Sequence, residues 1–559
     1  MPLFAVGCTE NEKEAALVTE NEKTNEEEQT KMTAVPEATP TPSKDPDEDL
    51  PYISGKLKRV SVHDPSIIAT ADSNGKKLYY IYGSHISGAK SADLANWTNF
   101  TNGYATKNNT LYGKLSENLA GPFSWAGEND SDCKGGFAVW APHIIYNEYY
   151  VNEDGSRGAY MDYFCTSSTY CRSAIGFAVS QKVDGDFVCK GILVCSGFTQ
   201  KSAKDKNSDK DKIWTNTNID ELMAAGKIDE GFNTEWGSGT AYNTDYAPNA
   251  IDPAILFDKE GRMWMSYGSW SGGIYMLELD RETGEAIYPK SNGKTEDGRV
   301  IDKYFGVRIA GGHTKSGEGP YIIYDEATDY YYLLTTYNYL DSVSGYNMRL
   351  FRSQNPTGPY VDAKGNNAVF PSKSVNMYNI GIKVMGNYAF SCHKGGYRSP
   401  GHCSAFKDDD GQMYLIYHTR FASGGEVFQT RVHPQFMNEQ AWPVTAVFEN
   451  RGDKISETGY PIEQIVGEYE FINHGTASDG ASVKTPVNIT LSEDGKITGD
   501  VTGTWSEKKD SYMASFTLDN VKYYGVFFKQ HDEASVSKLV MTFTAIGENN
   551  ETIWGVRKP

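Results

Sequence analysis

The chain has 559 residues, a formal net charge of −20 and an aromatic content of 13 %, including 37 Tyr. This length favours more than one domain. The acidic balance argues against a nucleic-acid partner, because such binding needs a basic surface that displaces counterions. It also disfavours a polyanionic glycan as substrate, whereas a neutral glycan is compatible with it.

The first 50 residues differ in composition from the rest of the chain. They carry 13 acidic and 4 basic residues, and no aromatic residue occurs between Thr9 and Leu50. Such a segment cannot bury enough apolar surface to fold, so residues 1–50 are predicted to contain a signal remnant and a disordered acidic linker.

Residues 3–8, Leu-Phe-Ala-Val-Gly-Cys, resemble the end of a bacterial lipoprotein signal. They predict a lipid on Cys8 as the protein's attachment to a membrane. The usual positive n-region is missing, so a disordered start without lipid is the alternative. We therefore expect an extracellular protein, either a cell-surface lipoprotein or secreted.

A short sequence pattern then occurs five times. Three of its five openings place an Asp or Glu beside Pro or Gly-Pro. The openings are Val62-His63-Asp64-Pro65-Ser66-Ile67, Val139-Trp140-Ala141-Pro142-His143-Ile144, Ile251-Asp252-Pro253-Ala254-Ile255, Glu318-Gly319-Pro320-Tyr321-Ile322 and Gly401-His402-Cys403-Ser404-Ala405-Phe406.

Each opening is followed by a polar or Gly-containing turn and then by an aromatic strand. The predicted strands cover residues 78–82, 160–164, 263–267, 330–334 and 413–417. A unit that recurs every 65 to 110 residues or so is typical of radial repetition, with one unit per blade. The pattern predicts an all-β fold with a five-bladed β-propeller over residues 51–455, in which the openings line the central channel.

Three other features lie within or near this region. We interpret the Lys-, Asp- and Ser-rich run Gln200–Trp214 as a solvated excursion, and we expect one short helix at Asp220–Ala225. The seven cysteines after Cys8 match no zinc motif, and both buried thiols and disulfides such as Cys165–Cys171 are compatible with their spacing.

Beyond residue 455 the composition changes to short segments that largely alternate apolar and polar residues. Gly and Asp turns separate most of these segments. This pattern predicts a second all-β domain over residues 456–559, a small antiparallel barrel or sandwich.

Three acidic residues of the openings suggest a chemistry. Hydrolysis of a glycosidic bond needs two carboxyls in opposite protonation states. Asp64, Asp252 and Glu318 are expected at equivalent repeat positions and therefore around one axial pocket. Desolvation near aromatic side chains would raise the pKa of Glu318, as suits an acid. Each motif taken alone also fits an ordinary turn at the start of a strand.

The combined motifs closely resemble those of glycoside hydrolase family 43, and within it the two-domain endo-α-1,5-L-arabinanases. The motifs are His63-Asp64-Pro65-Ser66-Ile67, Trp140-Ala141-Pro142-His143, Ile251-Asp252-Pro253, Tyr267-Gly268-Ser269-Trp270-Ser271-Gly272-Gly273-Ile274, Gly317-Glu318-Gly319-Pro320-Tyr321, Ser399-Pro400-Gly401-His402 and Tyr417-His418-Thr419-Arg420. The resemblance implies an inverting five-bladed enzyme with Asp64 as general base, Glu318 as general acid and Asp252 as the residue that tunes the acid.

The resemblance also implies further site residues. Substrate contacts are expected at His63, Trp140, Asn249, Ala250, Ile251, Ser269, Trp270 and Ser271. His418 resembles the family's metal-site histidine, which implies a calcium-like ion held mostly by water. His143 departs from the family pattern, where many relatives have Asp, and this puts the local substrate contacts in doubt.

These observations predict a monomeric hydrolase that cleaves internal α-1,5-L-arabinofuranosyl linkages of arabinan. Within the same family, an exo-acting arabinofuranosidase or β-xylosidase is an alternative. A retaining fructan hydrolase is another, although its acid and nucleophile motifs differ. A surface propeller that binds glycan without catalysis is the alternative from a different class.

Overall fold

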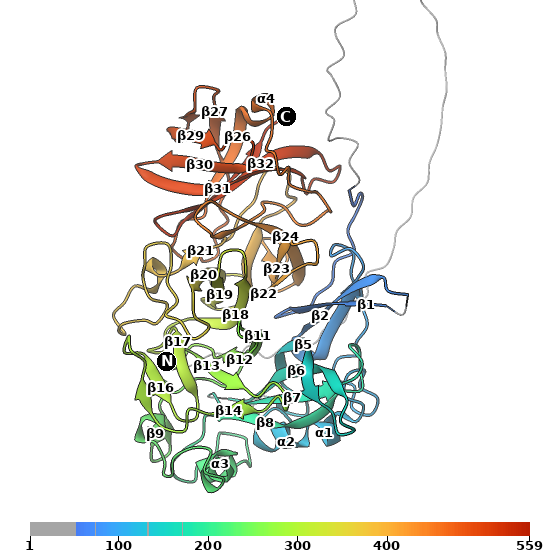
Figure 1. Cartoon of the computed structure of the whole chain (residues 1–559), viewed down its shortest axis with the longest axis vertical. Helices are drawn as coiled ribbons and strands as arrows, with labels where there is room; N and C mark the ends of the chain where they lie inside the picture. The colour runs from blue at the N-terminus through green and yellow to red at the C-terminus, as the bar shows by residue number, and fades with distance from the viewer. Residues whose placement is uncertain (1–51, 73, 131–132, 170) are drawn as a thin grey trace, which may run out of the picture. The chain divides into compact units, whose positions relative to one another are not determined.

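The computed structural model describes residues 52–72, 74–130, 133–169 and 171–559 (Figure 1). The region Tyr52–Pro559 forms one unit, built mainly from antiparallel β-structure. The predicted linker and Cys8 lie outside the described residues. Within the described part, no helix has the length and apolarity that crossing a membrane requires.

Four of the sheets between residues 66 and 445 have four strands each, paired in chain order. They comprise β1 (Ser66–Ala71), β2 (Lys77–Gly83), β3 (Ser87–Ser91) and β4 (Thr98–Asn99); β5 (Val139–Val151), β6 (Arg157–Ser167), β7 (Ser173–Ser180) and β8 (Val188–Ser196); β18 (Glu318–Asp325), β19 (Tyr330–Tyr337), β20 (Asn347–Ser353) and β21 (Ile382–Lys383); and β22 (Tyr397–Lys407), β23 (Met413–Phe421), β24 (Phe428–Met437) and β25 (Pro443–Thr445).

A seven-stranded sheet lies between the second and third of these in sequence, and a two-stranded one precedes it. The larger sheet contains β11 (Ala254–Phe257), β12 (Met263–Tyr267), β13 (Ile274–Leu279), β14 (Ala286–Ile287), β15 (Gly293–Lys294), β16 (Val300–Asp302) and β17 (Gly306–Ala310), and the smaller one contains β9 (Gly237–Ser238) and β10 (Ala241–Tyr242). The strand order of the larger sheet is β11-β12-β13-β17-β16-β15, with β14 paired to β13.

The first strands of these sheets contact one another in a ring. β1 contacts β5, β5 contacts β11, β11 contacts β18, β18 contacts β22, and β22 contacts β1. In each of the five sheets that contain a predicted aromatic strand, this strand pairs directly with the first strand, as the register of β1 with β2 and of β18 with β19 illustrates. The five strand predictions are confirmed, and the arrangement is propeller-like (Figure 1).

The remaining regular elements are short helices in the connections. The α-helices are α1 (Leu115–Asn118), α2 (Ala120–Trp125), α3 (Ile219–Ala224) and α4 (Ile462–Ile465), and the 3-10 helices are η2 (Ser84–Ile86), η4 (Trp214–Asn216), η5 (Thr234–Trp236) and η6 (Met377–Asn379). The helix expected at residues 220–225 is confirmed as α3. The thiols of Cys165, Cys171, Cys189, Cys195, Cys392 and Cys403 are free.

The interpretation of residues 200–214 as a solvated excursion is only partly correct. Asp205 in this segment is buried, and its carboxylate accepts hydrogen bonds from Arg172 Nε at 2.7 Å and Lys212 Nζ at 2.7 Å. Arg172 is itself fully buried and also pairs with Asp130. A buried guanidinium needs paired carboxylates, and this requirement anchors the segment to the β6–β7 turn.

The C-terminal part is a closed eight-stranded antiparallel barrel, one of the two forms predicted, a barrel or a sandwich. Its strands are β26 (Gly467–Asn473), β27 (Val487–Leu491), β28 (Lys496–Gly499), β29 (Gly503–Glu507), β30 (Met513–Leu518), β31 (Val521–His531), β32 (Leu539–Gly547) and β33 (Thr552–Arg557). Trp554 and Phe528 of the barrel share one hydrophobic core with Phe436 and Val444 of the β22–β25 sheet. The barrel is therefore packed against the propeller-like part.

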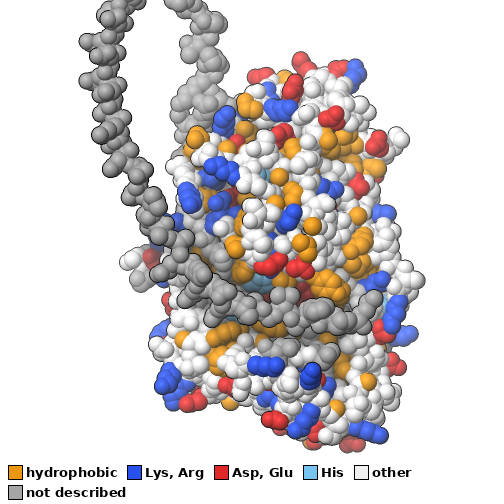
Figure 2. Space-filling model, turned by 180° about the vertical axis from the view of Figure 1, so that it is seen from behind, with side chains coloured by type: hydrophobic (Ala, Val, Ile, Leu, Met, Phe, Trp, Pro, Cys, Tyr) orange, Lys and Arg blue, Asp and Glu red, His pale blue; other side chains and the backbone are white. Residues whose placement is uncertain are grey.

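The surface carries charges of both signs. In the view of Figure 2, Lys and Arg side chains are interspersed with Asp and Glu, and apolar side chains lie between them. On this face the basic residues do not gather into one broad patch of the kind that tracks a nucleic-acid backbone.

We expect Trp554→Ala to destabilise the protein strongly. Trp554 is fully buried in the core that joins barrel and propeller, so truncation removes apolar contacts and leaves a cavity. The free energy of unfolding should fall by about 3–5 kcal/mol, measured by urea denaturation. Val536 is 78 % exposed, and Val536→Ala should leave the value unchanged. A similar small effect for both variants would contradict the shared core.

Candidate functional site

A central cavity is lined by residues from all five openings. The lining residues are Asp64, Pro65, Ser66, Ala141, Pro142, His143, Asp252, Pro253, Ala254, Pro320, Tyr321, His402, Cys403 and Ser404. Residues that are up to 340 positions apart in the chain are thus neighbours around one axis. Asp64 and Asp252 face the same cavity.

One backbone position repeats in every opening. Asp64, Ala141, Asp252, Gly319 and His402 all have positive φ, between 38° and 58°. Non-glycine residues rarely adopt this left-handed region, and such strain is maintained only where the surrounding structure imposes it. In four of the five openings the next residue is Pro, which has no N–H and therefore needs no hydrogen-bond partner there.

Glu318 does not occupy this repeated position. The left-handed residue in its opening is Gly319, so Glu318 lies one position earlier than Asp64 and Asp252 do in theirs. The expectation that all three carboxylates are equivalent is therefore wrong for Glu318. A register shift between Glu318 and Tyr321 in the pairing of β18 with β19 accompanies the difference, and Glu318 is not among the residues that line the central cavity.

Asp64 is buried beside three histidines. Its Oδ1 lies 2.8 Å from His63 Nδ1, 3.0 Å from His402 Nδ1 and 3.8 Å from His418 Nδ1. Its other oxygen accepts a hydrogen bond from the Ser84 hydroxyl. Burial by itself raises the pKa of Asp64, but His402 and His63 outweigh it and hold the pKa well below the usual value. Asp64 is thus ionised at neutral pH.

Asp252 has the opposite environment. It is buried, and the one described hydrogen-bond donor to its carboxyl is the Gly319 N–H, 3.1 Å from Oδ2. Burial, and next the negative charges of Glu318 and Asp64, raise the pKa of Asp252 well above its usual value. Like charges that share a poorly solvated site cannot all ionise.

Glu318 opens β18 and is held by three side chains. Its Oε2 accepts hydrogen bonds from Ser269 Oγ at 3.0 Å and Trp270 Nε1 at 2.9 Å. Its Oε1 accepts one from the Tyr346 hydroxyl at 2.5 Å. Burial raises the pKa of Glu318, and the hydrogen bonds from Tyr346 and Ser269 partly oppose this rise. The site therefore combines an ionised Asp64 with carboxyls that retain a proton to higher pH.

The other predicted contact residues are located as follows. Ser271 lies 3.3 Å from the Cys171 thiol, and Trp140 is partly buried at the start of β5. Asn249 Oδ1 accepts hydrogen bonds from Ser173 and Ser196 at 2.9 and 3.3 Å. Ala250 is fully buried, and Ile251 is 9 % exposed.

His143 lines the cavity as a neutral group. Its Nδ1 accepts the Ile255 N–H at 2.6 Å, and burial lowers the pKa of His143 to about 3. This histidine therefore supplies no charge to the site.

His418 is suited to hold a cation. It is fully buried, and desolvation lowers its pKa well below the usual value, so the ring is neutral. Within the described part of the chain its Nε2 has no hydrogen-bond partner. One nitrogen each of His63 and His418 and one oxygen of Asp64 lie within 4.8 Å of one another. These residues fit a cation site that has few protein ligands.

Three residues close to the carboxyls were missed at the level of sequence. His402 occupies the repeated left-handed position of the fifth opening, so alignment of the openings would have identified it. Ser84 and Tyr346 lie outside the openings and contact Asp64 and Glu318 only through the fold. No local sequence signal identifies them.

Comparison with family models gives two matches. The model of glycosyl hydrolases family 43 matches residues 224–442, and a C-terminal lipocalin-like domain model matches residues 448–555. The second match covers the barrel strands.

Several curated and solved proteins are similar over most of this chain. An extracellular endo-α-(1→5)-L-arabinanase of Thermotoga petrophila is 38 % identical over 509 residues, which cover 89 % of this chain and 93 % of the relative. A second one, from Bacillus subtilis, is 36 % identical over 515 residues with the same coverage.

Among solved structures, an endo-1,5-α-L-arabinanase of Thermotoga petrophila has a TM-score of 0.73 at 36 % identity, covering 90 % of this chain and 100 % of that one. A family 43 glycoside hydrolase of Bacillus licheniformis has a TM-score of 0.72 at 34 % identity, with 90 % and 99 % coverage.

Proposed function

Since the chain belongs to family 43 of the glycosyl hydrolases, we propose that it is an inverting endo-α-1,5-L-arabinanase that hydrolyses internal linkages of arabinan. The observation that carries the proposal is that three neighbouring carboxyls differ in their protonation states. Asp64 is ionised by its histidines, whereas burial raises the pKa values of Asp252 and Glu318. Such a divided set is what acid and base catalysis on one bond requires.

In the proposed mechanism Asp64 takes a proton from a water molecule as that water attacks the sugar. Glu318 donates its proton to the leaving oxygen on the opposite face. An inverting reaction requires the two carboxyl groups to be about 6.5–9.5 Å apart, so that water fits between sugar and base. We propose that Asp252 tunes the acid by accepting the Gly319 N–H next to Glu318, while burial and the negative charge of Asp64 raise the pKa of Glu318.

Substrate is proposed to bind along the side of the site that carries Trp270. The indole of Trp270 both donates to Glu318 and stacks on Tyr339, with ring centroids 4.7 Å apart. Aromatic faces suit the apolar faces of sugars. The other contacts that we propose are His63, Trp140, Asn249, Ala250, Ile251, Ser269 and Ser271.

We further propose a five-bladed architecture in which the seven-stranded sheet is the third blade. The ring of first-strand contacts and the shared cavity support this count. We place the domain boundary near residue 455, between the propeller of residues 51–455 and the C-terminal domain of residues 456–559. The names of the similar arabinanases include the word extracellular, and we propose the same location for this protein, as a monomer with a lipid on Cys8.

Calcium, or a similar hard cation, is proposed to bind at His418. His418 would be its protein ligand, and water oxygens would complete the shell that such ions prefer. When bound, the ion supplies positive charge next to Asp64. Asp64 and His63 lie close enough to contact ion-bound water.

We expect Glu318→Gln to reduce kcat/KM on linear arabinan by about 10²–10⁴-fold, because general acid catalysis contributes this much. The amide is isosteric, so the fold should persist. The measurement is release of reducing ends, with product lengths resolved by chromatography. The exposed Glu326 follows the same strand, and Glu326→Gln should have wild-type activity. Substantial activity of Glu318→Gln would rule out its role as the acid.

We expect Tyr346→Phe to move the alkaline limb of the pH–rate profile to higher pH. The Tyr346 hydroxyl donates to the Glu318 carboxyl and thereby lowers its pKa. Removing this donor raises the pKa of Glu318, so the acid stays protonated to higher pH. The acidic limb should stay in place because it reports Asp64. Movement of the limb to lower pH would contradict the assignment.

We expect chelator-treated protein to bind Ca²⁺ in isothermal titration calorimetry and to gain thermal stability with added Ca²⁺. His418→Gln should lose both effects. His433, on the neighbouring strand, is equally buried, but both of its ring nitrogens have partners. His433→Gln should therefore still bind the ion. Unchanged binding by His418→Gln would exclude this site.

A further inference from the structure

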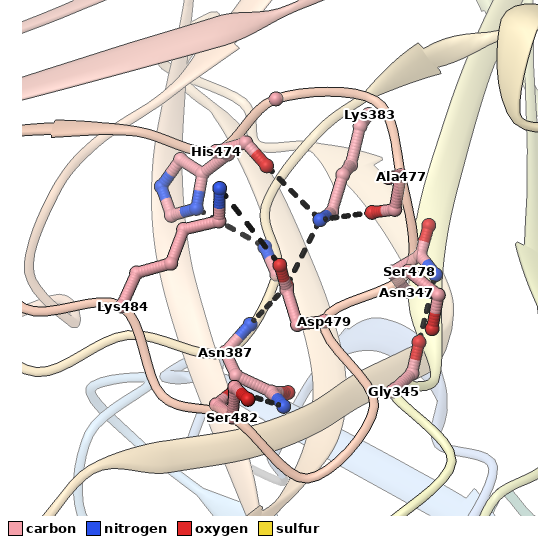
Figure 3. Close-up of polar contacts among 12 residues, drawn as sticks. Gly345, Asn347, Lys383, Asn387, His474, Ala477, Ser478, Asp479, Ser482 and Lys484 are labelled. Atoms are coloured by element: carbon pink, nitrogen blue, oxygen red, sulfur yellow. Dashed lines mark hydrogen bonds and ion pairs between the residues drawn. The ribbon is translucent and has the colours of Figure 1, made fainter.

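One segment of the barrel extends into the propeller-like part (Figure 3). This segment, residues 474–484, connects β26 to β27 and surrounds the ammonium group of Lys383 on β21. Lys383 Nζ donates to the carbonyls of His474 and Ala477 at 3.0 and 2.8 Å, and to Asp479 Oδ2 at 2.9 Å. The Lys383 side chain is fully buried and that of Asp479 is 7 % exposed. Breaking such a pair leaves an uncompensated buried charge, so it is a firm anchor.

Asn387 provides a second anchor for the same segment. Its side-chain amide donates to the carbonyls of Gly480 and Ser482, both at 2.9 Å, and its backbone N–H donates to Asp479 Oδ2 at 2.9 Å. Gly386 next to it is required by this packing, because a Cβ there would lie 2.0 Å from Asp479 Oδ2. Both anchors thus fix residues 477–482.

The fixed part of the segment packs directly on residues 338–346. Ser478 Oγ accepts a hydrogen bond from Asn338 Nδ2 at 3.0 Å and donates one to the Ser344 carbonyl at 3.2 Å. A Cβ at Gly345 would lie 2.5 Å from the Gly480 nitrogen. At Gly345 the two segments are therefore in close contact.

Residues 338–346 carry two side chains of the candidate site. Tyr346 donates to Glu318, and Tyr339 stacks on Trp270, which also donates to Glu318. The backbone N–H of Asn338 also donates to Ser316 Oγ at 2.5 Å, two residues before Glu318. Asn338 therefore joins the barrel segment to the loop that bears Glu318.

We propose that the barrel segment 474–484 is a positioning element of the active site, with Ser478 and Asp479 as positioning residues that hold Tyr346 and Tyr339 against Glu318 and Trp270. This inference rests on the proposed role of Glu318 as the acid. It gives the C-terminal barrel a part in catalysis that requires no contact between barrel and substrate. A 1 Å displacement of a positioned group is enough to cost about a hundredfold in rate.

The test compares Ser478→Ala and Asp479→Asn with matched changes elsewhere in or next to the barrel. Ser506→Ala is the control for the first, because Ser506 is exposed and bonds to Ser515. Asp453→Asn is the control for the second, because Asp453 pairs with His531 of the barrel at 2.7 Å, away from segment 474–484. Ser478→Ala keeps the Lys383–Asp479 pair and serves if Asp479→Asn does not fold.

Two measurements are made on each folded variant. Amide hydrogen exchange of the peptide spanning residues 338–347 should become about tenfold faster in the two test variants only. On linear arabinan, kcat should fall about ten- to a hundredfold with little change in KM. The alkaline limb should also move to higher pH, as for Tyr346→Phe, and combining Ser478→Ala with Tyr346→Phe should move it no further.

Unchanged exchange in residues 338–347 would overturn the proposal. So would faster exchange with an unmoved alkaline limb, because the segment would then stabilise the loop without acting on Glu318. If the wild-type protein releases no reducing ends from arabinan, the proposed function fails, while the exchange measurement still decides whether the segment holds the loop.

Discussion

The site depends on the shared burial of three carboxyl groups around one axis. Buried carboxylates that repel one another cannot all be charged, so the protonation state of each is set by its own neighbours. Asp64 has His63, His402 and His418 within 3.8 Å, whereas Asp252 receives one backbone N–H. The histidines thus determine that Asp64 carries the negative charge, and the carboxyls of Asp252 and Glu318 retain their protons to higher pH.

The same constraint acts on the backbone. The left-handed residue of each opening turns the chain at the cavity, and Pro after four of these residues removes an N–H that would otherwise need a partner there. The shift of Glu318 by one position separates it from the two aspartates. Glu318 accepts hydrogen bonds from Ser269, Trp270 and Tyr346. The fourth opening therefore contributes a carboxyl whose hydrogen-bond partners differ from those of the two aspartates.

The barrel and the propeller-like part are joined at two levels. A hydrophobic core that includes Trp554 and Phe436 spans both, and polar contacts of segment 474–484 reach the loop next to Glu318. The first type of contact is insensitive to small shifts, because apolar burial is non-directional. The polar contacts are directional, since hydrogen bonds weaken steeply with misalignment. They therefore fix the position of the loop relative to segment 474–484.

The sequence by itself determined the all-β class, the aromatic second strands, the short helix α3 and an antiparallel C-terminal domain, and it singled out Asp64, Asp252 and Glu318 as candidates. These features follow from residue periodicity, turn residues and repetition, which are local properties of the chain. The tertiary structure alone decided the one-residue offset of Glu318, the burial of Asp205, and the contacts of Ser84, Tyr346 and Ser478. These contacts join residues 20 to 140 positions apart. Protonation states likewise depended on burial and on partners from other sheets, because the energy of a charge is set by everything around it rather than by its neighbours in sequence.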